Sequence, residues 1–291
     1  MKTGRYMTVR ILLTVLLTFS MIGYLACSAV TSLARPSVCI SIIKEEKLSE
    51  KVYTALEKDF KEAYNTTAIP PETYMDAITS EWLEAEMCNY TEAYFDYING
   101  AKSTEYKADF TALEESITTF FYDYAESIDY EPDDVFSEKL SETIANAEKN
   151  VTQRMDAFYM QTLYENGILT KLQTYLPYVT GLNWGLWGVS IVLIALLVLL
   201  ERNGGWRRVY WTGCGLFSAG VLLTAPCAYI LGTDAVSGFA VKEPIVYTAI
   251  TNLLEGALQW FMIKAIVFCA IGLIFLILSV MLNKKSDKTV Q

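Results

Sequence analysis

The residue types that usually carry catalysis are scarce in this chain of 291 residues. It contains no histidine, which removes the usual general base, the commonest zinc ligand and the histidine-activated serine and cysteine nucleophiles. The remaining carboxylates form no evident acid–base pair. We therefore assign no catalytic, cofactor-binding or metal-binding residue, and we expect a protein that is not an enzyme and needs no cofactor.

One run of carboxylates, Asp-Tyr-Glu-Pro-Asp-Asp from Asp129, has oxygen ligands of the kind that calcium prefers. The run lacks the Asp-x-Asp-x-Asp-Gly spacing with a glutamate at the twelfth position. Asp133 or Asp134 is instead well placed to cap the helix that follows. Capping is the simpler interpretation.

The six cysteines do not form a disulfide framework, because four of them fall in or at apolar stretches. Only Cys39 and Cys88 lie in the polar part of the chain, on two neighbouring predicted helices. They form a disulfide if those helices are antiparallel and in register, which an export compartment permits.

An aromatic stripe recurs at helical spacing in Trp82, Tyr90, Tyr94 and Tyr97. Such rings indicate either a ligand-binding surface or a packed core with hydroxyl groups at its rim. Packing is the favoured interpretation.

Four apolar stretches are long enough, at about 1.5 Å per residue, to cross a hydrocarbon core of roughly 30 Å. The first resembles a cleaved signal peptide or, at Cys27, a lipoprotein signal. Its apolar run is longer than the usual 7 to 15 residues of a signal peptide, which favours a retained membrane helix. The predicted spans are residues 11–30, 184–200, 210–231 and 265–282.

The fold class predicted is all-α, with four transmembrane helices and an extracytoplasmic helical bundle inserted between spans 1 and 2. In the bundle, amphipathic patterns predict helices at 48–64 and from Pro70 to Asn99, another opened by a capping box at Thr111 and Glu114, and a fourth ending at Gly167. A short helix at 168–176 then leads through Pro177 into the second span. The expected domains are 1–34 (N-terminus and span 1), 35–179 (acidic helical domain), 180–231 (transmembrane hairpin), 232–264 (loop and amphipathic helix) and 265–291 (span 4 and tail).

The amphipathic part of the last long helix, 245–259, either docks on the bundle or bends into the membrane interface. Gly215 and Ala219, like Gly181 and Gly185, have a spacing that lets helices approach closely, and intramolecular packing of the hairpin is favoured over dimerisation. Lys264, at the edge of the last span, is expected to reach toward the outer headgroups.

Charge is unevenly distributed along the chain. The net charge is −10, but residues 36–178 contain 28 acidic and 11 basic residues, a net charge of −17. An acidic surface repels nucleic acid and anionic lipid, so we expect no nucleic-acid partner. Basic residues mark the cytoplasmic side, which predicts cytoplasmic termini and an exported 35–179 in the plasma membrane. They are Lys2, Arg5, Arg10, Arg202, Arg207, Arg208, Lys284, Lys285 and Lys288.

The layout of one span, a helical ectodomain and a close hairpin resembles that of uncharacterised multispan membrane proteins of Gram-positive bacteria. The resemblance covers roughly residues 1–230. It is carried by the Pro-Pro start before Glu72, by Trp82, and by Tyr-Phe-Asp-Tyr-Ile-Asn-Gly from Tyr94 to Gly100. It implies location and architecture and no reaction. The bundle between two spans also resembles the sensing domains of chemoreceptors, although the chain lacks their cytoplasmic signalling helices.

Two hypotheses about function follow. The preferred one is a membrane protein whose acidic domain binds a protein, peptide or envelope ligand, as an anchor, sensor or accessory subunit. Its partners are then the lipid bilayer and another membrane or envelope protein, or a second copy. The alternative is a pore or transport subunit with a cation-concentrating acidic mouth, for which the spans offer only the polar residues Thr212, Ser218, Thr224 and Ser279.

Overall fold

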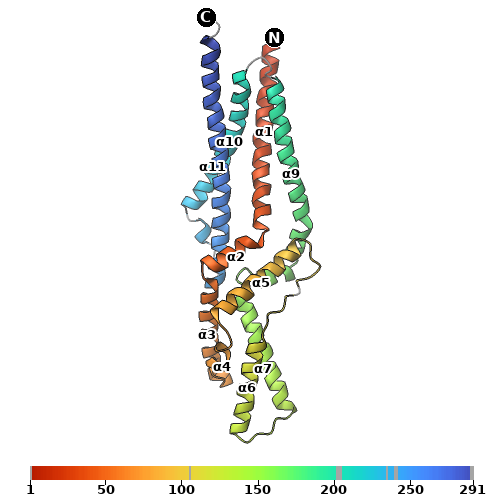
Figure 1. Ribbon diagram of the computed structural model, residues 1–291, viewed down its shortest axis with the longest axis vertical. Helices are drawn as coiled ribbons and strands as arrows, with labels where there is room; N and C mark the ends of the chain where they lie inside the picture. The colour runs from red at the N-terminus through yellow and green to blue at the C-terminus, as the bar shows by residue number, and fades with distance from the viewer. Residues whose placement is uncertain (1, 105, 201–204, 234, 239–241, 289–291) are drawn as a thin grey trace. The chain divides into compact units, whose positions relative to one another are not determined.

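The computed structural model describes residues 2–104, 106–200, 205–233, 235–238 and 242–288, and every regular element in these ranges is a helix (Figure 1). They form two compact units. The membrane unit comprises Met1–Ala34, Thr174–Phe239 and Leu254–Gln291, and the helical domain comprises Arg35–Gln173 and Ala240–Leu253. The predicted all-α fold is confirmed, with one apolar span at the N-terminus, then a helical region, then three more spans.

Four helices are long and apolar enough to cross a membrane: α1 (Lys2–Leu33), α9 (Ile168–Leu200), α10 (Gly205–Gly232) and α11 (Pro244–Lys288). Their apolar stretches exceed the predicted spans at most ends. Pro177 lies inside α9, which is one continuous helix. The separate short helix predicted at 168–176 is therefore the first part of α9. Residues 201–204, among them Arg202, lie outside the described residues, as do the side chains of Lys2, Arg5, Lys284, Lys285 and Lys288.

The membrane unit has a small core and an apolar exterior. Leu17 of α1, Leu197 of α9 and Leu216 of α10 meet in one buried cluster. Phe19, Trp184 and Leu199 are each at least 66% exposed. Large apolar side chains are stable at such positions when hydrocarbon surrounds them, which fits a bilayer-embedded unit.

Several polar groups in the membrane unit bond within it, although the Thr212 and Thr224 hydroxyls have no hydrogen-bond partner among the described residues. Thr18 Oγ1 donates to the Gly215 carbonyl at 3.2 Å, and the Ser20 and Ser190 hydroxyls lie 2.9 Å apart. Lys264 Nζ lies 3.4 Å from the centre of the Trp260 ring and donates to Ser28 Oγ at 3.2 Å. The lysine at the edge of the last span thus has partners within the protein.

Small residues let α10 pack closely against its neighbours. A Cβ on Gly215 would meet Leu17 of α1 at 2.9 Å, and Ala219 is fully buried. The packing is intramolecular, as the spacing favours, but the close approach at Gly215 is to the first span and not within the predicted hairpin. Gly181 and Gly185, the other such pair, face open space.

The helical domain contains α2 (Pro36–Glu45), α3 (Leu48–Thr67), α4 (Pro71–Met75), α5 (Ser80–Ile98), α6 (Thr111–Ser127), α7 (Asp134–Met155), α8 (Met160–Glu165) and the first residues of α9 and α11. Its core lies where α2, α3, α5 and α7 meet, around Ile43, Leu56, Leu83, Met87 and Val151. The start of α11 belongs to this unit. Of the two arrangements that the sequence allowed for this helix, the docked one is observed.

Caps explain where the helices depart from prediction. The helix predicted from Pro70 to Asn99 is two helices, because the Thr79 side chain accepts from the Trp82 N–H and starts α5. The predicted capping box at Thr111 is wrong: Asp109 accepts from both the backbone and the hydroxyl of Thr111. Asp133 caps α7 by accepting from the Phe136 N–H at 2.8 Å, which confirms the capping interpretation of the acidic run.

The fourth helix predicted for the bundle, which was expected to end at Gly167, is also two helices in the structure, α7 and α8. It breaks at Asp156, whose carboxylate accepts from the backbone N–H groups of Met160 at 2.6 Å and Gln161 at 3.0 Å. The new helix, α8, ends at Glu165, and Gly167 follows with φ of +69°. The described residues between 101 and 110 form a loop with neither helix nor strand.

Candidate functional site

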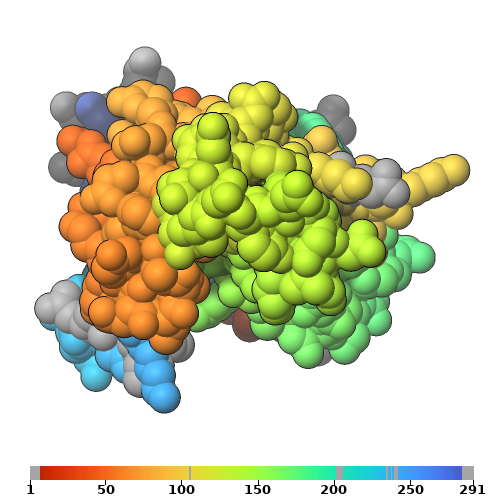
Figure 2. All heavy atoms as spheres, turned by 90° about the horizontal axis from the view of Figure 1, so that it is seen from below, coloured from red at the N-terminus to blue at the C-terminus, as the bar shows by residue number. Residues whose placement is uncertain are grey.

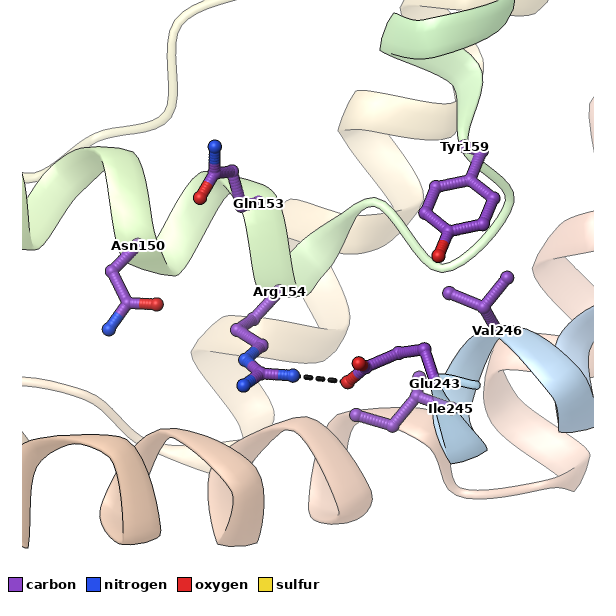
Figure 3. Close-up of a pocket in the computed structure, with 7 residues that line it drawn as sticks. All are labelled: Asn150, Gln153, Arg154, Tyr159, Glu243, Ile245 and Val246. Carbon is purple, nitrogen blue, oxygen red and sulfur yellow. Dashed lines mark hydrogen bonds and ion pairs between the residues drawn. The ribbon is translucent and has the colours of Figure 1, made fainter. Parts of the chain in front are cut away.

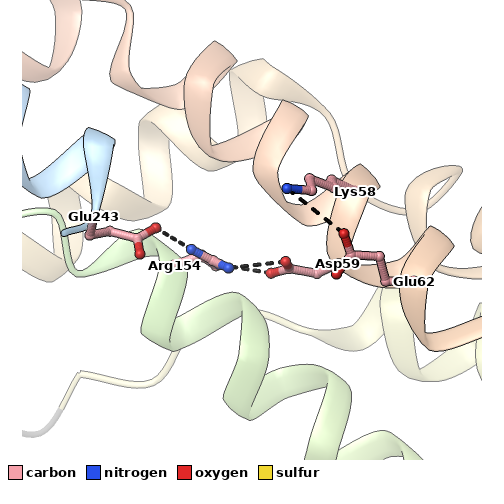
Figure 4. Close-up of polar contacts among 5 residues, drawn as sticks. All are labelled: Lys58, Asp59, Glu62, Arg154 and Glu243. Carbon is pink, nitrogen blue, oxygen red and sulfur yellow. Dashed lines mark hydrogen bonds and ion pairs between the residues drawn. The ribbon is translucent and has the colours of Figure 1, made fainter.

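Arg154, in the last turn of α7, joins three segments of the helical domain. Its Nε and Nη2 donate to the two carboxylate oxygens of Asp59 on α3, at 2.7 and 3.0 Å. Its Nη1 donates to the carboxylate of Glu243, directly before α11 (Figure 4). Because the planar guanidinium matches a carboxylate with two parallel bonds, this arrangement fixes the register of α7 against α3.

The three charged side chains are neither buried nor fully solvated. Arg154 is 28% exposed, Asp59 23% and Glu243 36%. The hydrogen bonds and charges of the two carboxylates, those of Asp59 first, raise the pKa of Arg154 above its usual value. Water screens such partly exposed pairs, so their main effect is to position the segments. The nearby Lys58–Glu62 pair on α3 is far more exposed, with its atoms 3.8 Å apart.

A cavity of about 270 Å³ lies beside this arginine (Figure 3). Two amide side chains, a phenol, the ion pair and two aliphatic side chains line it, from α7, the turn before α8, and the start of α11. The lining residues are Asn150, Gln153, Arg154, Tyr159, Glu243, Ile245 and Val246. We call it the Arg154 pocket.

Tyr159 forms one end of the Arg154 pocket, opposite Asn150 (Figure 3). Its φ is +53°, a left-handed conformation that residues other than glycine seldom adopt. The turn is held there because the Asp156 carboxylate caps α8 directly after it. Strain of this kind, maintained by the surrounding structure, is common at binding sites.

The pocket has the chemistry of recognition. Arginine has five N–H groups, of which the bonds to Asp59 and Glu243 use three. The amides of Asn150 and Gln153 offer both donors and acceptors. Ile245 and Val246, each at most 5% exposed, supply an apolar floor. Such a lining suits a polar, uncharged group such as a peptide backbone.

The predicted aromatic stripe lies largely inside the domain. Tyr90, Tyr94 and Tyr97 are 5%, 6% and 8% exposed, and the Tyr90 hydroxyl donates to that of Tyr94 at 3.4 Å. The Tyr97 hydroxyl lies 2.9 Å from that of Thr170. Trp82 is half-buried, with its ring 5.8 Å from that of Phe110. The tyrosines therefore pack as a core, and only Trp82 of the four retains appreciable exposure.

Two carboxylates of the helical domain are buried. Asp156 is 7% exposed, and desolvation raises its pKa although two backbone N–H groups partly offset the effect. Glu86 is 9% exposed, and burial, then the charge of Asp109, raise its pKa. Glu86 Oε2 has no hydrogen-bond partner among the described residues.

Cys39 and Cys88 are both free thiols in the structure. The helices that carry them, α2 and α5, pack against each other. Burial raises the pKa of the Cys39 thiol to about 12, so it is a poor nucleophile. The disulfide stays a prediction, which the mass of the intact protein before and after reduction tests.

Sequence reasoning missed the Arg154 pocket, although one signal pointed to it. Arg154 is the single arginine between residues 36 and 178, among 28 acidic residues. An arginine among so many acidic residues is expected to pair with carboxylates. Its partners were not predictable, because Asp59 and Glu243 lie 95 and 89 positions away along the chain.

No family model, curated protein or solved structure matches the chain. The resemblance based on Glu72, Trp82 and the Tyr94–Gly100 segment therefore stays an expectation about layout. Four long apolar helices, with an apolar exterior around a small core, carry the remaining conclusion. The chain is a multispan helical membrane protein.

Proposed function

We propose that this membrane protein is not an enzyme and that its acidic helical domain binds a protein, peptide or envelope ligand outside the cytoplasm. In this role it acts as an anchor, a sensor or an accessory subunit. It lies in the plasma membrane as a multi-pass protein, with both termini in the cytoplasm and residues 35–179 outside.

The charge distribution supports this orientation. Arg207 and Arg208 stand in the first turns of α10, at one end of a span, and basic residues in short connections are retained in the cytoplasm. The polar segment between spans 1 and 2 has a net charge of −17. It is also long enough to form its own core and carry a binding surface.

The Arg154 pocket is the observation that carries the binding function. It joins residues 150–159 to residues 243–246, which belong to different connections between spans. A ligand that bridges Gln153 and Ile245 therefore contacts the bundle and the start of the last spanning helix together. This arrangement suits an anchor or sensor.

The polar span residues give the pore alternative little support. Thr212 and Ser279 are 4% and 1% exposed within the membrane unit, and the Ser279 hydroxyl donates to the carbonyl of Leu276. Side chains enclosed in one chain do not line a path between chains. Of the four, only Ser218 is exposed.

Purification of the full-length protein from native membranes in mild detergent tests the proposal. We expect a different membrane or envelope protein to co-purify in a fixed ratio. The variant Tyr159→Asn, which keeps a residue tolerant of positive φ but removes the ring, should lower that ratio. Tyr64→Asn, at a similarly exposed tyrosine on α3, is the control and should not.

Two results would contradict the proposal. One is a closed homo-oligomer with nothing else bound that conducts ions in liposomes. The other is a reaction that a chelator abolishes and one added metal restores.

A further inference from the structure

The tip of the α6–α7 hairpin has an apolar groove separate from the Arg154 pocket. The groove has a volume of about 280 Å³. Seven of its eight lining residues are aromatic or aliphatic: Phe121, Tyr124, Ala125, Ile128, Tyr130, Val135 and Phe136, with Lys139 as the eighth. We call residues 121–139 the hairpin tip.

The hairpin tip is exposed to an unusual degree for its composition. Tyr124 and Val135 are each 59% exposed, Ile128 55% and Tyr130 42%. Figure 2 looks onto this end of the hairpin, in yellow-green, where no other segment of the helical domain covers it. Contiguous apolar groups facing water in this way usually mark an interaction surface.

Local packing holds the groove in shape. The ring centres of Phe121 and Phe136 lie 5.9 Å apart, so the two helices are joined by aromatic contact at their tip. Asp133 caps α7 at the turn, which fixes where the second helix starts. A surface that is already formed loses little conformational entropy when it binds a partner.

Charge identifies the kind of partner. The hairpin tip has seven carboxylates and one basic side chain, Lys139. A second copy of the same tip would place like charges together, and an anionic membrane surface would be repelled for the same reason. A segment with basic side chains beside apolar ones would place apolar groups in the groove and positive charges next to the surrounding carboxylates.

We propose that the hairpin tip docks a cationic, amphipathic segment of a partner protein. Apolar side chains of that segment fill the groove between α6 and α7, and its lysines or arginines face the surrounding carboxylates. The proposal rests on the binding function assigned to the helical domain and adds a second contact surface with defined partner chemistry.

A designed helical peptide of leucine and lysine, with its leucines on one face, tests the proposal against the full-length protein in detergent. We expect saturable binding that weakens as salt is added. The variant Ile128→Ser should weaken it about tenfold, because the groove loses one of its apolar lining side chains. Tyr64→Ser, at an exposed residue outside both the groove and the Arg154 pocket, should leave it unchanged.

Charge variants test the rim separately. Neutralising Glu126 and Glu131 to glutamine should weaken binding about threefold at low salt, whereas Glu92→Gln with Asp96→Asn, at exposed positions on α5, should not. A peptide of leucine and glutamate should fail to bind.

Three results would overturn this inference: no binding of the cationic peptide, equal loss with Ile128→Ser and Tyr64→Ser, or equal binding of the acidic peptide. If a partner still co-purifies with the wild-type protein in these cases, the binding function stands and the hairpin-tip proposal alone fails. If no partner co-purifies either, the binding function fails with it.

Discussion

At the scale of single residues, Arg154 decides how the helical domain is joined. Three of its N–H donors bond to carboxylates from two segments that no helix connects directly, those of Asp59 and Glu243 (Figure 4). Lysine could not replace it, because an ammonium group cannot form two parallel hydrogen bonds to the Asp59 carboxylate.

We therefore expect Arg154→Met to destabilise the helical domain by about 1 to 2 kcal/mol, since it leaves Asp59 and Glu243 facing each other without a cation. This range is below that for fully buried pairs, because water screens these groups in part. The labelling rate of Cys39, which is 1% exposed, by a thiol reagent reports the opening of the domain. Lys58→Met, which removes an exposed pair on α3, is the control and should not change that rate. Equal rates in wild type and Arg154→Met would show that the arginine does not join the segments.

Glu86 predicts a specific pH dependence. Burial raises its pKa, so the folded state holds this proton at a pH where the unfolded chain has lost it. Protonated Glu86 therefore stabilises the helical domain below the unfolded-state pKa, near 4.5, and this stabilisation is lost as the pH rises through the folded-state pKa of Glu86. Glu86→Gln stays neutral throughout and should stabilise the domain by about 1 kcal/mol at pH 7 but not at pH 4.

Thermal unfolding of the purified protein at the two pH values measures this effect, with Glu92→Gln, at an exposed position on α5, as the matched control. A Glu86→Gln variant less stable than wild type at pH 7 would mean that the ionised carboxylate has a stabilising partner.

At the scale of elements, the membrane unit depends on glycines that let helices touch. A Cβ on Gly272 of α11 would lie 2.4 Å from the backbone nitrogen of Phe217 on α10, and backbone atoms cannot move aside cheaply. We expect Gly272→Ala to destabilise the α10–α11 contact by about 1 to 3 kcal/mol. Gly188→Ala on α9, where a Cβ meets nothing within 4 Å, should be neutral or slightly stabilising. The two variants are compared by the loss of helical circular dichroism on heating in detergent. Equal unfolding midpoints for Gly272→Ala and Gly188→Ala would exclude the close contact between α10 and α11.

Helix type and location were predictable from the sequence because hydrophobic periodicity and span length are local properties. The breaks were less so. Thr79 and Asp156 each start a new helix by accepting backbone N–H groups, and Asp109 takes the capping role expected of Glu114. Threonine and aspartate are common inside helical patterns as well, so only the observed hydrogen bonds distinguish a cap from a solvated side chain.

The site was less predictable than the fold. The spacing of Tyr90 and Tyr94 allowed a ligand-binding surface or a packed core and favoured the core, and their rings do pack inside the domain. The Arg154 pocket depends on Glu243, in another connection between spans, and no periodic pattern relates residues so far apart. The hairpin tip was visible as a charged run, but the exposure of Ile128 required the structure.

At the scale of the whole molecule, charge and apolarity separate along the chain. Residues 36–178 have a net charge of −17 and the rest of the chain +7. The four long apolar helices require a bilayer, and the basic residues at their connections favour the cytoplasm. This separation underlies both the proposed orientation and the proposed ligand binding outside the membrane.

The most direct test is labelling of intact cells with a membrane-impermeant maleimide, using single cysteines placed in a cysteine-free background. Glu92→Cys on α5 and Thr8→Cys at the start of α1 are both exposed positions. The proposed orientation predicts that Glu92→Cys reacts in intact cells, whereas Thr8→Cys reacts only after permeabilisation. Labelling of Thr8→Cys in intact cells, with Glu92→Cys protected, would invert the orientation and remove the basis for an extracytoplasmic binding domain.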